Sequence, residues 1–89
     1  MTRKDRIAAA LTEALRPIRL DIADESDRHA GHAGVRPGGE THYRVNIVSP
    51  AFVGKSRVER HRMVNALLAT EFANGLHALA IAAAAPDEA

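Results

Sequence analysis

Histidine offers the most chemistry in this sequence, because the chain holds five histidines and no cysteine. His29 and His32 form a His-x-x-His pair within 28–39, a segment with four glycines, one proline and no hydrophobic periodicity. That spacing permits metal binding, although it is also common by chance. His77 begins the last expected strand, whose start can approach the same loop. His77 with His29 or His32 would be two imidazoles from distant segments, which suits a shared metal centre lacking a full ligand set of its own.

The other two histidines favour simpler interpretations. His61 lies three residues before Val64 and seven before Leu68, inside an apolar helical stripe. We therefore expect a hydrogen-bonded, partly buried structural residue there rather than a ligand. His42 opens a strand on its polar face, where we expect an exposed side chain. No Ser/His/Asp or paired-carboxylate arrangement stands out, so the sequence indicates no enzyme.

A basic cluster marks the start of the long helix, made of Lys55, Arg57, Arg60 and Arg62. It suits docking on nucleic-acid phosphates or on an acidic protein surface. The alternative is a solvated helix end, partly neutralised by Glu59. Cations near a helix N-terminus oppose its dipole by a few tenths of a kcal/mol or more, so the cluster has no local stabilising role. A phosphate-binding loop is not expected, because Ser49 stands where that motif requires its first glycine.

The first half of the chain predicts a helix and two strands. Apolar residues at i, i+4 and i+8 in an alanine-rich segment predict a helix over about 3–15, ended by Pro17. Alternation of Ile18, Leu20 and Ile22 with polar residues predicts a half-buried strand. Alternation resumes over 41–48, with the apolar positions Tyr43, Val45 and Ile47 on one face. These two strands most simply pair antiparallel across the loop.

The second half predicts a long helix and a third strand. The stretch 52–72 opens as a tight turn, and Ser56 with Glu59 forms a capping box at the helix start. The stripe Val64, Leu67, Leu68 and Phe72 should press against a sheet, and Asn74-Gly75 ends the helix. We expect a strand over 76–83, parallel to the strand before it, and a frayed tail over 84–89.

The resulting fold class is α+β, in the order α-β-β-α-β, with a three-stranded mixed sheet and helices packed on one face. Eighty-nine residues suit one domain, 1–89. The absence of cysteine excludes disulfides and thiolate metal sites, and the formal net charge of +1 argues against nucleic-acid binding through bulk charge alone. The sequence shows no signal peptide or membrane span, so we expect a cytoplasmic protein without a membrane partner.

Several motifs together are similar to those of a known family, the BolA-like proteins. The residues that carry this resemblance follow one another through nearly the whole chain: Asp24-Glu25-Ser26, His29-Ala30-Gly31-His32, Gly39-Glu40-Thr41-His42-Tyr43-Arg44-Val45, Ile47-Val48-Ser49, Phe52-x-Gly54-x-Ser56, Arg60-His61-Arg62-x-Val64 and His77-Ala78-Leu79. The Arg-His-Arg and His-Ala-Leu signatures are together quite specific. The resemblance implies a fold similar to class II KH domains.

The resemblance also implies a partner and a cofactor. BolA-like proteins form complexes with monothiol glutaredoxins, and some of these complexes hold a bridging [2Fe-2S] cluster used in cluster trafficking or iron sensing. The glutaredoxin would supply its cysteine and bound glutathione, and this chain would supply His77 and a loop residue, His29, with His32 as the alternative loop ligand. Two histidines on one iron would resemble a Rieske arrangement. No cofactor is expected in the isolated chain.

Two rival functions stay open. The family also suggests a DNA-binding transcriptional regulator that acts through the KH-like face and the basic helix, although near-neutral charge and few stacking aromatics weaken it. A regulatory adaptor that binds glutaredoxin without a cluster is the other. The chain alone would be a monomer or a weak homodimer. In all cases we expect one working surface that combines the loop, the start of the third strand and the basic helix end.

Overall fold

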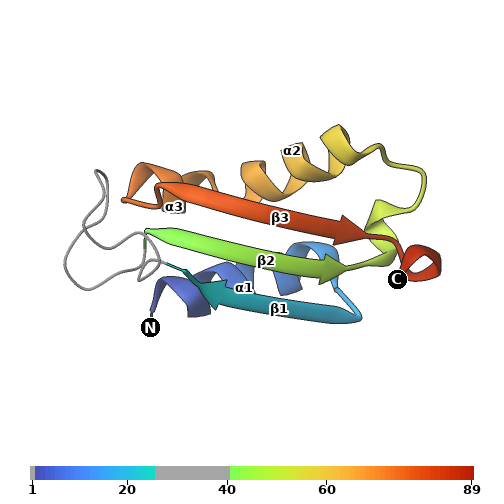
Figure 1. The fold of residues 1–89 in the computed structure, drawn as a ribbon, viewed down its shortest axis with the longest axis horizontal. Helices are drawn as coiled ribbons and strands as arrows, with labels where there is room; N and C mark the ends of the chain where they lie inside the picture. Colours follow the sequence, from blue (N-terminus) through green and yellow to red (C-terminus); the bar gives the residue numbers. More distant parts are fainter. Residues whose placement is uncertain (1, 26–40) are drawn as a thin grey trace.

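The computed structural model describes residues 2–25 and 41–89, and the sheet is the element that positions everything else. Its strands are β1 (Arg19–Asp24), β2 (His42–Val48) and β3 (Ala78–Ala84), in the order β1-β2-β3. β1 pairs antiparallel with β2, and β2 pairs parallel with β3 (Figure 1). This arrangement confirms the predicted mixed sheet. The N-terminal ends of β2 and β3 therefore lie at the same end of the sheet, with the C-terminal end of β1.

Helix α1 (Arg3–Leu15) begins and ends as the sequence predicts. Thr2 caps it, because its Oγ1 accepts a hydrogen bond from the Asp5 backbone N at 3.2 Å while the Asp5 carboxylate accepts one from the Thr2 N at 3.0 Å. Ile7, Leu11 and Leu15 are buried along one side of the helix. α1 ends where Arg16 adopts a left-handed conformation, one residue before Pro17.

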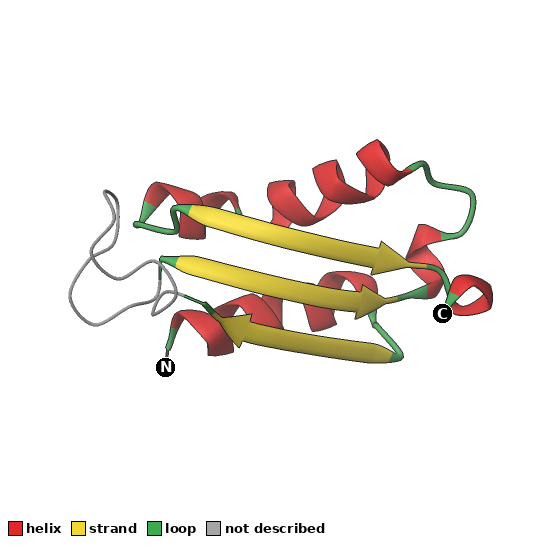
Figure 2. Cartoon of the chain, in the orientation of Figure 1, coloured by secondary structure: helices red, strands yellow, loops and turns green. Residues whose placement is uncertain are grey.

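The helices cover one face of the sheet and leave the other open (Figure 2). On the covered face Tyr43, Val45 and Ile47 of β2 are at most 3% exposed, which confirms the predicted alternation. Leu20 and Ile22 of β1 pack against the same core. Ile18, however, is 66% exposed, so its predicted place in the core is wrong. It precedes the strand, and the alternation of β1 does not govern its side chain.

The long helix of the sequence prediction is two helices, α2 (Arg57–Leu67) and α3 (Ala69–Ala73). The predicted capping box of Ser56 and Glu59 is present at the start of α2. The chain breaks its helical geometry at Leu68, which has φ −105° and ψ 14°. Leu68 and Val64 are fully buried, but Leu67 and Phe72 are more than a third exposed. The predicted apolar stripe is therefore confirmed at Val64 and Leu68 and wrong at Leu67 and Phe72.

Short turns connect these elements. Pro50–Phe52 form a single 3₁₀ turn, η2, and Phe52 is fully buried in the hydrophobic core. Gly75 ends α3 with φ 116°, as the Asn74-Gly75 pair predicts. β3 starts at Ala78 rather than 76 and continues to Ala84.

The tail differs from the frayed end that the sequence predicts. Ala85 is 2% exposed, and Pro86–Glu88 form a 3₁₀ turn, η3. The Glu88 carboxylate accepts hydrogen bonds from the Ala85 backbone N at 2.8 Å and from Arg60 Nη2 at 3.0 Å. These side-chain contacts, which no periodicity signals, hold the tail against α2.

Candidate functional site: an imidazole pair at one end of the sheet

Two histidines meet at the end of the sheet where β2 and β3 begin. His42 is the first residue of β2, and His77 directly precedes β3. The centroids of their rings lie 5.2 Å apart, with the ring planes inclined at 50°. His77 is exposed and His42 is half-buried. The pair therefore presents imidazole chemistry at a surface that a second molecule can reach.

The backbone of Thr41 holds the two strand starts together. Its carbonyl oxygen accepts hydrogen bonds from the backbone N of His77 at 2.8 Å and of Ala78 at 3.1 Å. The Thr41 Oγ1 also lies 2.9 Å from the Nδ1 of His42, within hydrogen-bonding distance. Thr41 itself is 2% exposed. A buried residue thus anchors both histidines.

The predicted partners of His77, His29 and His32, lie outside the residues that the structure describes, so their convergence with His77 stays a prediction. The described residues that flank the loop do lie at this end of the sheet. Glu25, the last of them before the loop, donates its backbone N–H to the carbonyl oxygen of His42 at 2.7 Å. Thr41 is the first described residue after the loop. Glu25 and Thr41, the described residues on either side of 26–40, therefore both lie beside the imidazole pair.

Sequence reasoning missed the contact between His42 and His77. Position 42 on the polar face of a strand predicts only an exposed side chain. The register shows what brings the rings together, because His42 pairs with Ala78 across the parallel ladder. A parallel β2–β3 pair with the correct register would have revealed this neighbour, but register depends on contacts between distant residues.

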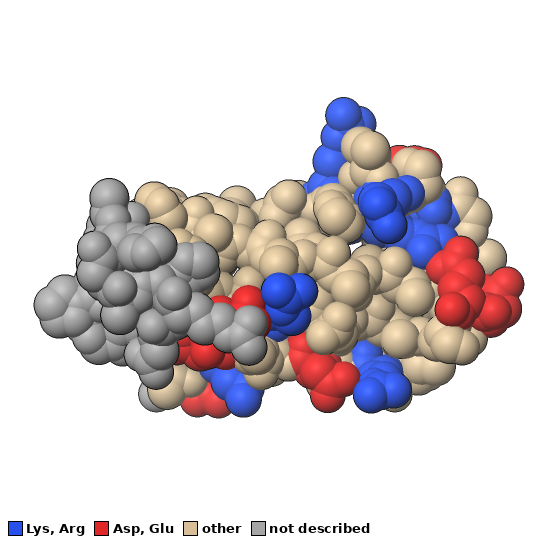
Figure 3. All heavy atoms as spheres, in the orientation of Figure 1, with Lys and Arg blue, Asp and Glu red and all other residues tan. Residues whose placement is uncertain are grey.

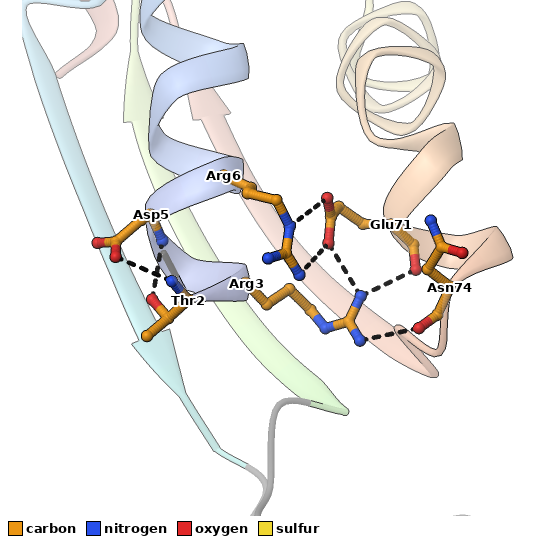
Figure 4. Close-up of polar contacts among 6 residues, drawn as sticks. All are labelled: Thr2, Arg3, Asp5, Arg6, Glu71 and Asn74. Carbon is orange, nitrogen blue, oxygen red and sulfur yellow. Dashed lines mark hydrogen bonds and ion pairs between the residues drawn. The ribbon is translucent and has the colours of Figure 1, made fainter.

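A buried ion-pair network fixes the turn that leads to His77 (Figure 4). Arg3 of α1 donates from Nη1 to the Glu71 carboxylate at 2.9 Å and to the Glu71 carbonyl at 3.1 Å. Its Nη2 donates to the carbonyl of Asn74 at 3.0 Å. Arg6 donates to the two oxygens of the same carboxylate at 3.0 and 3.2 Å. The guanidinium of Arg3 thus caps carbonyls at the C-terminal end of α3, six and three residues before His77.

The basic cluster lies at the opposite end of the sheet from His77. Arg60 of α2 donates to the carbonyl of Ala83, near the end of β3. Seven residues of β3 separate the two ends, a distance of about 20 Å at about 3.3 Å per residue. The prediction of one working surface that combines His77 with the basic helix end is therefore wrong, because the parallel crossover carries the chain across the whole sheet.

The four predicted cations differ in their availability. Lys55, Arg57 and Arg62 are exposed, and blue side chains gather over α2 in Figure 3. The Arg60 side chain is only 11% exposed, because it pairs with Glu88 and lies over the Phe52 ring at 5.9 Å. Arg60 therefore has a structural role. The exposed Arg57 lines, with residues of the sheet, an open hollow of about 690 Å³.

His61 is half-buried, as the sequence predicts, and lines the same hollow. The predicted hydrogen bond is not found, since no described residue bonds to its ring. The reason is its position on α2, where it faces the hollow beside Arg57 and Arg60 rather than a polar group of the core. His61 therefore lies toward the C-terminal end of β3, away from His77, and its structural role stays a prediction.

Comparison with known proteins identifies the family to which this chain belongs. The sequence profile described as BolA-like protein matches residues 11–88, so the chain belongs to the BolA-like family. A protein of Sinorhizobium sp. described as uncharacterized, from the cobS 5' region, is 51% identical over 99% of this chain and 96% of its own length. UV-induced protein uvi31 of Schizosaccharomyces pombe is 48% identical over 99% and 90%.

Solved structures agree with this assignment. The BolA domain of SufE1 from Arabidopsis thaliana superposes with a TM-score of 0.90 at 46% identity, over 100% of this chain and 98% of that domain. BolA1 from the same plant gives a TM-score of 0.89 at 44% identity, over 100% and 97%. Some curated relatives are longer, since the chain spans 24% of Arabidopsis SufE-like protein 1, chloroplastic/mitochondrial, and 56% of human BolA-like protein 1.

The predicted BolA-like fold is thereby confirmed. Among residues 2–25 and 41–89, no helix combines the length and apolar character needed to cross a bilayer. The expected cytoplasmic location stays a prediction, because the names of some relatives place them in chloroplasts or mitochondria.

Proposed function

We propose that this chain is a non-enzymatic adaptor that binds a monothiol glutaredoxin and shares with it a bridging [2Fe-2S] cluster. The observation that carries the proposal is the exposed His77 at the end of the sheet, beside the residues that flank the 26–40 segment. A shared cluster needs ligands that a second protein can approach, and His77 meets this condition. A relative named SufE-like protein 1 is consistent with a role connected to iron–sulfur chemistry.

The donor chemistry of the chain fits half of such a centre. The sequence has no cysteine, so its ligands to iron would be imidazole nitrogens, as on the histidine-bound iron of a Rieske cluster. His77 and either His29 or His32 would hold that iron. When bound, the cluster would either carry electrons or itself be the cargo passed to another protein. The thiolates would come from the glutaredoxin cysteine and its glutathione.

The test is spectroscopy of the purified complex with a monothiol glutaredoxin. We expect His77→Ala to abolish the ultraviolet–visible signal of the cluster in the mixed complex while the circular dichroism of the chain is unchanged. His61→Ala is the matched control, because it removes a half-buried imidazole at the other end of the sheet. A His77→Ala complex with the wild-type spectrum would refute the proposal. His29→Ala and His32→Ala, measured separately, would assign the loop ligand.

The same preparation tests a cluster-free adaptor. That function requires the two proteins to co-purify without a cluster signal under anaerobic, iron-replete conditions. A stable complex with the signal excludes it. The name of one relative, UV-induced protein uvi31, suggests that either adaptor acts in a stress response.

DNA binding is the second candidate, favoured by the three exposed cations at the start of α2. Binding of this kind should weaken steeply with salt, and each phosphate contact removed should lower the slope of log K against log salt by about 1. Arg57→Ala is the informative variant, and Lys4→Ala on α1 is the exposed control. Arg60→Ala is unsuitable because Arg60 holds the tail. A salt slope that Arg57→Ala leaves unchanged would remove this candidate.

A further inference from the structure

The ring of His42 is placed to control the orientation of the ring of His77. We propose that His42 is a positioning residue, which holds His77 in the orientation that a partner or metal centre meets. The proposal deepens the proposed function, because it assigns a role next to the expected iron ligand. It concerns a residue for which the sequence predicted only exposure.

The backbone of His77 is held more firmly than its exposed side chain. Its side chain is exposed, and exposed side chains sample several staggered rotamers. The backbone at this position is well held, since its N–H donates to the Thr41 carbonyl at 2.8 Å. This backbone contact fixes the position of the His77 Cα atom but not the direction of its imidazole ring.

Hydrogen-bonding contacts hold His42 in place beside the imidazole of His77. Its Nδ1 lies 2.9 Å from the hydroxyl of Thr41, a residue only 2% exposed, and its backbone carbonyl accepts from the Glu25 N at 2.7 Å. The 5.2 Å between ring centroids and the 50° tilt fall within the range of favourable aromatic pairs. His42 is thus a fixed surface against which the His77 ring rests.

The rotamers open to the His77 side chain set the size of the effect. A side chain free to occupy three χ1 wells has the competent well populated about one third of the time, so the apparent affinity falls to about one third of its value. A second, roughly twofold choice at χ2 extends the factor to about six. Loss of the His42 ring should therefore weaken cluster-dependent binding by about threefold to sixfold, rather than abolish it.

The experiment compares His42→Ala with His42→Phe, because phenylalanine keeps a ring but has no ring nitrogen. The first readout is the χ1 rotamer population of His77 in the isolated chain, from three-bond NMR couplings. We expect one dominant rotamer in the wild type, averaging in His42→Ala and recovery in His42→Phe. His61→Ala is the control and should leave the rotamer of His77 unchanged.

The second readout is the dissociation constant of the cluster-loaded complex with a monothiol glutaredoxin. We expect a threefold to sixfold weakening in His42→Ala that His42→Phe restores. The proposal is overturned if His42→Ala leaves a single His77 rotamer, or if His42→Phe behaves like His42→Ala, which would mean that a ring nitrogen acts instead. If the wild type forms no cluster-loaded complex, the proposed function fails, and the rotamer measurement alone still decides the role of His42.

Discussion

Replacing Glu71 by glutamine should cost this small domain a large part of its stability. The Glu71 carboxylate, whose side chain is 10% exposed, accepts hydrogen bonds from Arg3 and Arg6. Glutamine keeps the shape but removes the negative charge and turns an N–H donor toward guanidinium donors. The buried guanidinium of Arg3, 11% exposed, then loses its counter-ion.

The structure sets the expected magnitude. Removing one partner of a buried ion pair typically costs about 3–5 kcal/mol. Two features reduce this value here, because Arg3 retains hydrogen bonds to the carbonyls of Glu71 and Asn74, and the Arg6 side chain is 42% exposed. We expect Glu71→Gln to lower the free energy of unfolding by about 2–3 kcal/mol. For a domain of this size that corresponds to a fall in Tm of roughly 10–20 °C.

Urea unfolding followed by circular dichroism measures this change. Glu13→Gln provides a matched control, because it makes the same chemical change at an exposed position of α1. Its free energy of unfolding should stay within about 0.5 kcal/mol of the wild-type value. Arg6→Gln should fall between the two. If Glu71→Gln and Glu13→Gln have the same free energy of unfolding, the ion-pair network does not stabilise the packing of α3 on α1.

Three further changes test other parts of the fold. The Arg60 guanidinium and the Ala85 N–H lower the pKa of Glu88 to about 2 from an ordinary 4.5. The ionised Glu88 therefore stabilises the fold fully above about pH 4.5, and this contribution is lost as the pH falls toward 2. In acid titrations, Glu88→Gln should remove this part of the dependence of the free energy of unfolding on pH. Gly54 has φ 76° with no atom near its missing Cβ, so Gly54→Ala should cost about 1–2 kcal/mol through backbone strain alone and Gly54→Asn less, both by urea unfolding. His61→Ala should lower stability by about 1 kcal/mol or less, because the side chain is only half-buried; a loss as large as that of Glu71→Gln would contradict this placement.

Local patterns were sufficient to predict most of the elements. The alternation of Tyr43, Val45 and Ile47 follows directly from the two-residue period of a strand, and the three buried side chains confirm it. The bounds of α1 follow from its apolar spacing and from Pro17. The parallel pairing of β2 and β3 follows from the intervening helices, since a helical crossover returns the chain to the end of the sheet where the previous strand began. Each of these signals is contained within a few neighbouring residues or in a general rule of connection.

The break at Leu68 could not be predicted in the same way. Val64, Leu68 and Phe72 continue a helical period without interruption, so the pattern indicates one helix. The structure ends α2 one turn early, and α3 places Glu71 against Arg3, 68 residues away. A contact of this sequence separation leaves no trace in local periodicity. Phe72 becomes partly exposed as a result, although its spacing predicts a core position.

The candidate site shows the same division. His77 was predicted from its place at a strand start, and its exposure agrees with a ligand that a partner must reach. The neighbour that the structure gives it, His42, depends on the parallel register, which pairs His42 with Ala78. The buried state of Arg60 likewise depends on Glu88, 28 residues further along the chain. The sequence identified His77 and Arg60 as candidate functional residues, but it could not predict their partners, His42 and Glu88.

The length of β3 also separates the two proposed binding sites, which the sequence analysis had placed on one surface. Because about 20 Å of strand lies between His77 and Ala83, a protein bound at the imidazole pair need not contact the exposed Arg57 at the start of α2. Exposed charges at that distance are largely screened from each other at physiological ionic strength, where the Debye length is about 8 Å. Charge removal at Arg57 should therefore leave cluster binding unchanged, while loss of the His77 imidazole should leave any salt-dependent DNA binding unchanged. A variant at one end that alters both activities would require a coupling through the sheet that its packed, regular register gives no reason to expect.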